Sequence, residues 1–116
     1  MLWSPDVQVS RVIVCDPNIN ALTIPITINI KDESIETTAL INCGAEGTFI
    51  HKKLVKQHQL LTYMLNRPII AQNMDNTINK KGVITRYTKL NLGLNTMDKR
   101  LLITNTGKSP IILGLL

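Results

Sequence analysis

Strict alternation of hydrophobic and polar side chains marks the segment LTIPITINI at residues 22–30. Every second position is Leu or Ile, and Thr, Pro or Asn stands between them, which is the period of a β-strand with one buried face. Pro25 lies on the polar side of this pattern and has no backbone N–H to donate. The pattern therefore predicts a strand that forms a sheet edge, contains a bulge or is locally unpaired at Pro25.

Two further strands are expected around this one, at residues 7–14 (VQVSRVIV) and residues 36–41 (ETTALI). The connecting segments DPNIN (residues 16–20) and KDES (residues 31–34) are built from Asp, Asn, Ser and Pro, which favour turns. This arrangement predicts two hairpin connections in the first third of the chain.

The hydrophobic period changes at residues 48–61 (TFIHKKLVKQHQLL), where apolar residues recur at three- and four-residue spacing. The members of this series are Phe49, Ile50, Leu54 and Val55, continued by His58 and Leu61. Thr48 is of a residue type that often caps a helix. We expect a short helix here with Thr48 as its N-cap.

The second half of the chain returns to strand patterns. RPIIAQ (residues 67–72) and VITRYTKLNLGL (residues 83–94) flank the polar stretch NMDNTINKKG (residues 73–82), so a hairpin with a polar tip is the simplest arrangement. KRLLITN (residues 99–105) and IILGLL (residues 111–116) read as the closing apolar segments.

The composition agrees with one mostly β domain. Of the 116 residues, 44% are hydrophobic but only 3% are aromatic, so the core must be built from Ile, Leu and Val. Ile and Val suit the half-buried surface of a sheet, and a chain of this length commonly forms one domain. We expect an all-β fold with one short helix, as a single domain over residues 1–116.

The net charge of +5 and the pI near 9.5 raise the question of a nucleic-acid or anionic membrane partner. The basic residues fall into separate groups, however, and no interleaved aromatic set offers bases a stacking platform. These groups are Lys52, Lys53 and Lys56; Lys80 and Lys81; and Lys99 and Arg100. Nucleic acid is therefore not expected as the main partner, and a basic RNA- or DNA-binding β domain is kept only as a third hypothesis.

Two cysteines, Cys15 and Cys43, are too few for a disulfide scaffold, which favours a reducing compartment. No apolar run approaches the ~18 residues of a membrane-spanning helix, and no basic segment followed by an apolar one opens the chain. We expect a cytoplasmic protein with no secretory signal and no membrane partner.

Two motifs carry a family resemblance: NCGA (residues 42–45), directly after the strand-like ALI, and IILGL (residues 111–115). Together with the polar hairpin that contains QNMDNT (residues 72–77), they resemble the retropepsins, the dimeric aspartic proteases of retroviruses and Ty3/gypsy-type retrotransposons. The resemblance extends over about residues 20–115. In that family the first motif reads DSGA or DTGA.

The resemblance implies a closed β-barrel of the acid-protease type and a homodimer in which each subunit contributes one aspartate to a shared site. It also implies a polyprotein substrate, an intracellular retroelement particle as location, and no cofactor or metal. Two carboxyl groups about 3 Å apart share one proton. The ionised group then activates water while the neutral group polarises the scissile carbonyl. The positions that match the catalytic motif in this chain are Asn42, Cys43 and Gly44.

This chain differs from the family at the catalytic aspartate, whose position is occupied by Asn42. A carboxamide neither takes a proton from water at neutral pH nor shares one with its twin, and a homodimer loses both acids at once. The sequence predicts an aspartic endopeptidase domain with negligible peptide hydrolysis. The substitution is explained either as an engineered inactivation or as a natural loss. The alternative function is a domesticated, non-catalytic protease-like domain that binds peptides or mediates self-association.

Cys43 stands where the family has Ser or Thr, whose hydroxyl braces the dimer beneath the active site. A thiol is a weaker donor and acceptor, so this brace is expected to be softer, and a small buried residue is the plain interpretation. A catalytic cysteine paired with His51 or His58 is disfavoured because a helix that leads away from the turn carries both histidines out of reach. A zinc site from Cys15, Cys43, His51 and His58 lacks any recognised close pair of ligands.

Substrate contacts are expected beside the motif and at the hairpin tip. Gly44 permits the turn, and Ala45 is short enough to let a peptide backbone approach. The expected substrate-binding residues are Ala45, Glu46, Met74, Asp75, Asn76 and Thr77, with a simple turn-forming role as the alternative for Asp75. The resemblance implies that Gly114 packs close to the NCGA turn. Retropepsins continue past ILG into a helix and a strand of the dimer sheet, so we expect a shortened C-terminus or a dimer held by other contacts.

Overall fold

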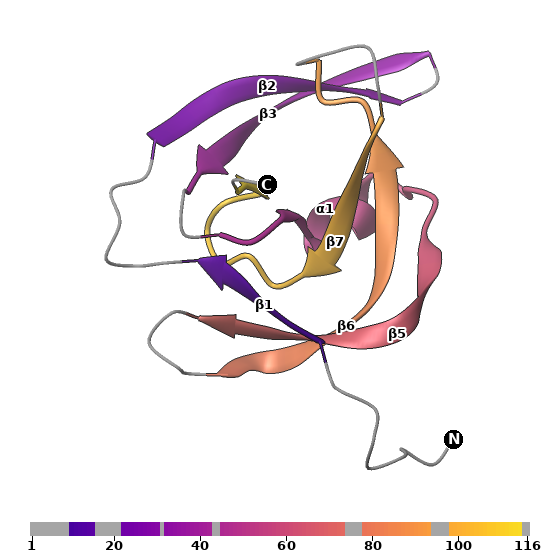
Figure 1. Ribbon diagram of the computed structural model, residues 1–116. Coiled ribbons are helices and arrows are strands. Elements are labelled where there is room, and N and C mark those ends of the chain that lie inside the picture. Colours follow the sequence, from indigo (N-terminus) through magenta and orange to yellow (C-terminus); the bar gives the residue numbers. More distant parts are fainter. Residues whose placement is uncertain are drawn as a thin grey trace.

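The computed structural model describes residues 10–15, 22–30, 32–42, 45–73, 78–93 and 98–114. These residues form strands and one short helix (Figure 1). In chain order the elements are β1 (Ser10–Cys15), β2 (Leu22–Ile30), β3 (Glu33–Ile41), β4 (Thr48–His51), α1 (Lys52–Gln57), β5 (Tyr63–Asn73), β6 (Ile78–Leu90), β7 (Lys99–Thr104) and β8 (Ile111–Leu113). The expectation of a mostly β fold with one short helix is confirmed.

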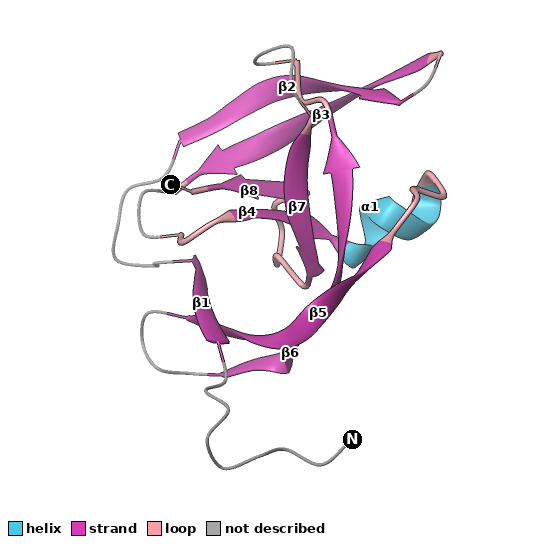
Figure 2. Ribbon diagram, turned by 45° about the vertical axis from the view of Figure 1, so that its right-hand side comes forward, coloured by secondary structure: helices cyan, strands magenta, loops and turns pink. Residues whose placement is uncertain are grey.

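The strands form one mixed sheet in the order β1-β5-β6-β7-β4-β8-β3-β2. Neighbours are antiparallel except for three parallel pairs, β1 with β5, β3 with β8, and β4 with β7. The last strand, β8, therefore lies between β3 and β4, although β5, β6 and β7 separate it from both of them in the sequence (Figure 2). An isolated bridge from Asn29 in β2 to Asn91 brings the β2 end of the sheet back to the residue after β6.

The alternating segment behaves as its pattern predicted. β2 is the last strand in the order, so Pro25 lies in an edge strand, and the prediction for this segment is confirmed. Ile26 and Ile28 face the core, with 6% and 0% of their surface exposed. β2 pairs with β3 along its whole length, from Leu22 opposite Ile41 to Ile30 opposite Glu33.

The prediction of a second hairpin in the first third of the chain, between residues 7–14 and residues 22–30, is wrong. β1 pairs with β5 in parallel, and it lies at the opposite end of the strand order from β2. Residues 16–20 lie outside the described residues, but the strands that flank them are not partners. Turn-forming residues mark where the chain leaves a strand, and they do not determine which strand it joins next.

The expected helix begins later than its pattern suggested. Thr48 opens β4 instead of capping a helix, and α1 starts at Lys52 with His51 as its N-cap. The imidazole Nδ1 of His51 accepts a hydrogen bond from the backbone N–H of Lys53 at 3.0 Å. The apolar run at residues 48–50 is buried on consecutive positions, which is typical of a strand packed on both faces.

The later hairpin is confirmed, with longer strands than expected. β5 and β6 pair in an antiparallel manner, and β6 already begins at Ile78, inside the stretch assigned to the polar tip. Asn and Lys favour strands only weakly, so strand pairing here overrides the local preference. Within β6, Ile84, Thr88 and Leu90 are buried.

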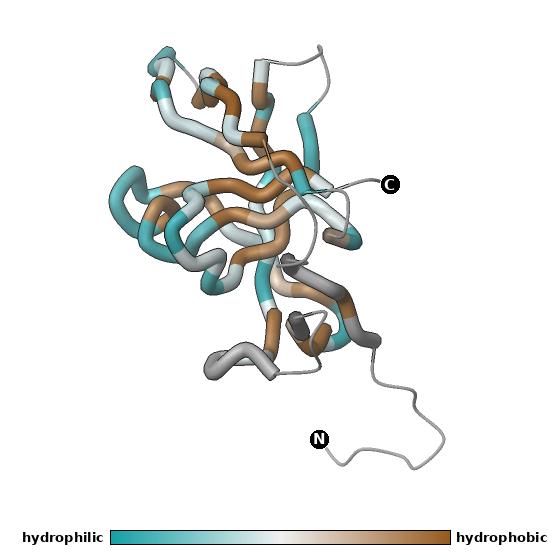
Figure 3. The backbone as a smooth tube through the Cα atoms, turned by 90° about the vertical axis from the view of Figure 1, so that its left-hand side faces the viewer, coloured by the Kyte–Doolittle hydropathy of each residue, from teal (hydrophilic) through white to brown (hydrophobic). Residues whose placement is uncertain are grey.

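The sheet buries apolar side chains on both of its faces. Phe49 and Ile50 are consecutive and both fully buried, yet they belong to different hydrophobic clusters. The first core contains Ile26, Ile28, Ala39, Ile50, Val55, Leu60, Leu90, Leu92, Leu101 and Ile111. The second core contains Ala45, Phe49, Ala71, Ile84, Leu102 and Ile112. Hydrophobic segments accordingly run through the middle of the molecule, with hydrophilic ones at the turns (Figure 3). Among the described residues, no helix is long and apolar enough to cross a membrane.

Candidate functional site

Asn42 lies at the end of β3 and is almost fully buried, with 1% of its surface exposed. Its backbone N–H donates to the carbonyl oxygen of Leu113 at 3.0 Å, and its own carbonyl accepts from the N–H of Ala45 at the same distance. Asn42 is thus tied to Ala45 on one side and to β8 on the other. Cys43 and Gly44, the other two residues of the expected catalytic motif, lie outside the described residues.

Gly114 packs directly against Ala45 and Gly47, as the family resemblance implied. Its N–H donates to the carbonyl oxygen of Gly47 at 2.9 Å. A β-carbon at position 114 would lie 2.3 Å from the carbonyl oxygen of Ala45 and 2.6 Å from that of Gly47. Both distances are far below van der Waals contact, so only glycine fits here without a shift of the backbone. The NCGA and IILGL motifs therefore meet in space through close contact between main chains.

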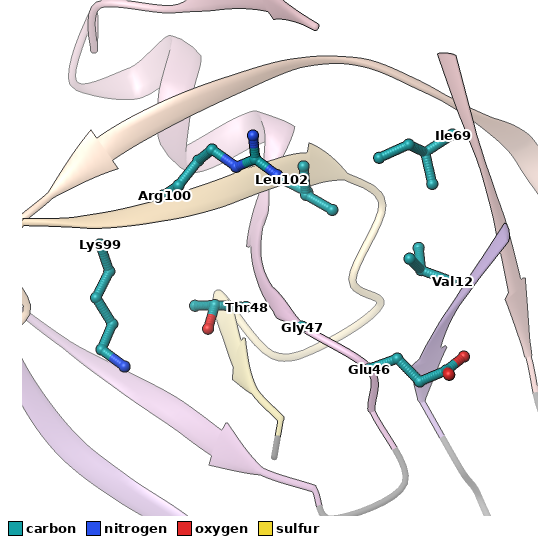
Figure 4. Close-up of a pocket in the computed structure, with 8 residues that line it drawn as sticks. All are labelled: Val12, Glu46, Gly47, Thr48, Ile69, Lys99, Arg100 and Leu102. Atoms are coloured by element: carbon teal, nitrogen blue, oxygen red, sulfur yellow. The ribbon is translucent and has the colours of Figure 1, made fainter. Parts of the chain in front are cut away.

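A pocket of about 380 Å³ opens beside the turn (Figure 4). It is lined by Val12 of β1, by Glu46, Gly47 and Thr48 at the start of β4, by Ile69 of β5, and by Lys99, Arg100 and Leu102 of β7. Its walls are mainly the apolar side chains of the second core, and its charged groups lie at the rim. We call it the β7 pocket.

Of the expected substrate-binding residues, Glu46 lines the β7 pocket. Ala45 lies next to it in sequence but is buried in the second core at 2% exposure, and its contact with a peptide stays a prediction. Met74, Asp75, Asn76 and Thr77 lie outside the described residues. The strands on either side of them in the sequence, β5 and β6, do form the predicted hairpin.

The structure also brings together a set of residues that the sequence did not reveal. Tyr63 and Tyr87 stack with ring centroids 5.3 Å apart, Lys89 lies over the ring of Tyr63, and Arg100 lies over the ring of Tyr87. Aromatic and basic residues that are separate in sequence are therefore interleaved in space, contrary to the expectation. The register of β5, β6 and β7 creates this stack, since a slip of one residue would turn these side chains to the other face of the sheet.

His51 serves a structural purpose in the described part of the chain, because its Nδ1 caps α1. Burial, followed by the nearby charges of Lys53 and Lys52, lowers the pKa of His51, and a hydrogen bond with Asn105 acts in the opposite direction. The described residues contain no group of three or more His, Cys, Asp or Glu that could hold a metal ion.

The profile of the PEG10/RTL1 protease domain matches residues 38–116. The matched segment includes both the NCGA turn and the glycine that packs on it. No curated protein and no solved structure is significantly similar to the chain. Since the match covers well over half of the sequence, the chain belongs to the PEG10/RTL1 protease domain family, retropepsin-like protease domains of retrotransposon origin.

Proposed function

We propose that this chain is the protease-type domain of a retroelement-derived polyprotein, which keeps the aspartic-protease scaffold but lacks the hydrolytic step. The single observation that carries the proposal is Asn42, buried at the end of β3 where the family motif has its aspartate. The partners in this proposal are a second copy of the chain and an extended polyprotein segment. A closed barrel around a shared cleft belongs to the same proposal.

The chemistry of the missing group explains the loss of activity. An aspartic dyad needs two carboxyl groups that share one proton, with one as general base and the other as general acid. The amide of Asn42 has no proton affinity near neutral pH and cannot take either part. General acid/base catalysis of this kind contributes roughly 10²- to 10⁴-fold, so hydrolysis by the chain as written is expected to be negligible.

The surroundings of Asn42 favour restoration of the acid by a single change. Burial disfavours an ionised carboxylate and raises the pKa of a buried aspartic acid. In a dimer with two such residues face to face, repulsion between like charges would add to this shift and keep one proton on the pair. Asp and Asn have nearly the same shape, so two backbone hydrogen bonds remain available: the one that Asn42 donates to Leu113 and the one that it accepts from Ala45.

The test is the Asn42→Asp variant, assayed between pH 4 and 7 on peptides with bulky apolar residues on both sides of the scissile bond. The parent chain and Asn42→Ala serve as controls, and sedimentation measures the oligomeric state of all three. Cleavage by Asn42→Asp alone, strongest at acid pH, is the expected result. A folded, dimeric Asn42→Asp protein that cleaves nothing over this range would contradict the proposal.

The β7 pocket favours a second candidate function, that of a non-catalytic peptide-binding domain. None of its lining residues is Asn42, so the pocket does not depend on the group that was lost. Peptide binding by the unmodified chain, without cleavage, supports this function. If Asn42→Asp cleaves the same peptides, the binding reflects an ordinary protease cleft in which only the acid is missing.

A further inference from the structure

The β7 pocket has an apolar interior, and its rim carries more positively charged than negatively charged side chains. Val12, Ile69 and Leu102 provide the apolar walls, and all three belong to or pack against the second core. Lys99 and Arg100 contribute two positive charges and Glu46 one negative charge. The rim therefore carries a net positive charge, in keeping with the excess of basic residues in the chain.

The charges are also separated in space. Glu46 lies on the side of the pocket next to Val12, whereas Lys99 and Arg100 lie on β7 on the opposite side, with side chains that point in opposite directions from the strand (Figure 4). Coulomb interactions weaken with distance and with screening by water. An anionic group that enters on the β7 side and approaches either cation thus interacts with it more strongly than with Glu46.

The side chain of Arg100 is also held in position by the ring of Tyr87, which does not line the pocket. Its guanidinium group lies 5.2 Å from the centre of the Tyr87 ring, and Tyr87 itself stacks on Tyr63. A guanidinium that is already ordered by an aromatic ring loses less side-chain entropy when it binds a carboxylate. Arg100 is accordingly the stronger of the two candidates for anion recognition.

We propose that the β7 pocket selects an acidic side chain, above all glutamate, from the bound peptide, with Arg100 and Lys99 as the residues that determine this preference. A glutamate suits the pocket because its methylene groups can contact the apolar walls while its carboxylate reaches the cationic side of the rim. The inference rests on the proposed function, since it takes the ligand of the pocket to be an extended peptide.

The first experiment compares binding of two capped seven-residue peptides of Ala, Val and Leu that differ only in a central Glu or Gln. Binding to the unmodified chain is followed by calorimetry and by shifts of the methyl resonances of Val12, Ile69 and Leu102, which line the pocket. The Glu peptide is expected to bind about two- to fivefold more tightly, as partly exposed ion pairs allow. This ratio is expected to fall as salt is added.

Variants on the rim separate a local effect from the general charge of the protein. Arg100→Gln and Lys99→Gln are each expected to reduce the Glu/Gln ratio, whereas Glu46→Gln is expected to increase it. Lys56→Gln is the matched control, because Lys56 is an exposed cation on α1 that does not line the pocket. If only the net charge of the protein mattered, Arg100→Gln, Lys99→Gln and Lys56→Gln would reduce the Glu/Gln affinity ratio equally.

Equal affinities for the two peptides, or an equal effect of Lys56→Gln and Arg100→Gln, overturns the inference. Absence of methyl shifts at Val12, Ile69 and Leu102 with either peptide overturns it as well. The proposed function is judged separately. Its test is whether the Asn42→Asp variant cleaves peptides that lack acidic residues. Cleavage without a preference for Glu leaves that function intact, and a preference without cleavage leaves the inference intact.

Discussion

Replacement of Gly114 by Ala tests the contact that joins the two family motifs. The added methyl group would lie 2.3 Å and 2.6 Å from two carbonyl oxygens of the turn, those of Ala45 and Gly47. Both are main-chain atoms, so relief requires a backbone shift. Overpacking of this kind costs about 1–3 kcal/mol, and loss of the hydrogen bond from Gly114 to Gly47 adds about 0.5–1.5 kcal/mol. We expect Gly114→Ala to lower the free energy of unfolding by about 2–4 kcal/mol.

The measurement is urea unfolding followed by circular dichroism, with Gly47→Ala as the matched control. Neither Gly114 nor Gly47 has a positive φ. Either change therefore reduces the conformational entropy of the unfolded chain, and so favours folding, to the same extent. A β-carbon at Gly47 would make only ordinary contact, 3.5 Å from the Phe49 ring. Gly47→Ala should therefore be neutral or stabilising by up to about 1 kcal/mol. Equal unfolding midpoints for the two variants would refute the close packing described here.

Two buried threonines and one histidine give further predictions. Thr88→Val removes the hydrogen bond from the Thr88 hydroxyl to the carbonyl oxygen of Leu61 and should destabilise the protein by about 1 kcal/mol. Thr104→Val should instead be neutral or stabilising by about 1 kcal/mol, since the buried Thr104 hydroxyl has no hydrogen-bond partner; urea unfolding of the pair checks the difference in sign. Folding lowers the pKa of His51 below 6.5, so the unfolded chain binds more protons near that pH. Stability should therefore fall as the pH drops below about 6.5 and level off below the folded-state pKa. His51→Asn, which keeps a capping side chain that does not titrate, should weaken this pH dependence, and unchanged midpoints at pH 5 and 7.5 in the parent chain would contradict it.

The parts of the fold that the sequence predicted are those specified by local patterns. The alternation at residues 22–30 set the inward face of β2, and an edge strand, which the structure contains, was one of the three arrangements that Pro25 allowed. The polar stretch at residues 73–82 marked the β5–β6 hairpin. The pair of motifs around Asn42 and Gly114 pointed to a contact that the structure contains.

The features that sequence reasoning missed depend on contacts between distant segments. The parallel pairing of β1 with β5, and the stack of Tyr63 and Tyr87 between two cations, arise from strand order and register. The helix start was misplaced because residues 48–50 are buried on two faces at once, which removes the alternation that normally identifies a strand. The cationic rim of the β7 pocket likewise emerges only when β7 is placed beside β4.

The position of β8 has a consequence for how the chain folds during synthesis. Ile111–Leu113 separates β3 from β4, so until these residues have left the ribosome the pairing that joins the two parts of the described sheet is the isolated bridge between Asn29 and Asn91. Before then, β3 and β4 each present an open edge, the kind of surface on which strands of other molecules can add. Completion of the sheet thus waits for residues 111–113, and a nascent chain of this kind benefits from protection against aggregation until β8 has been made.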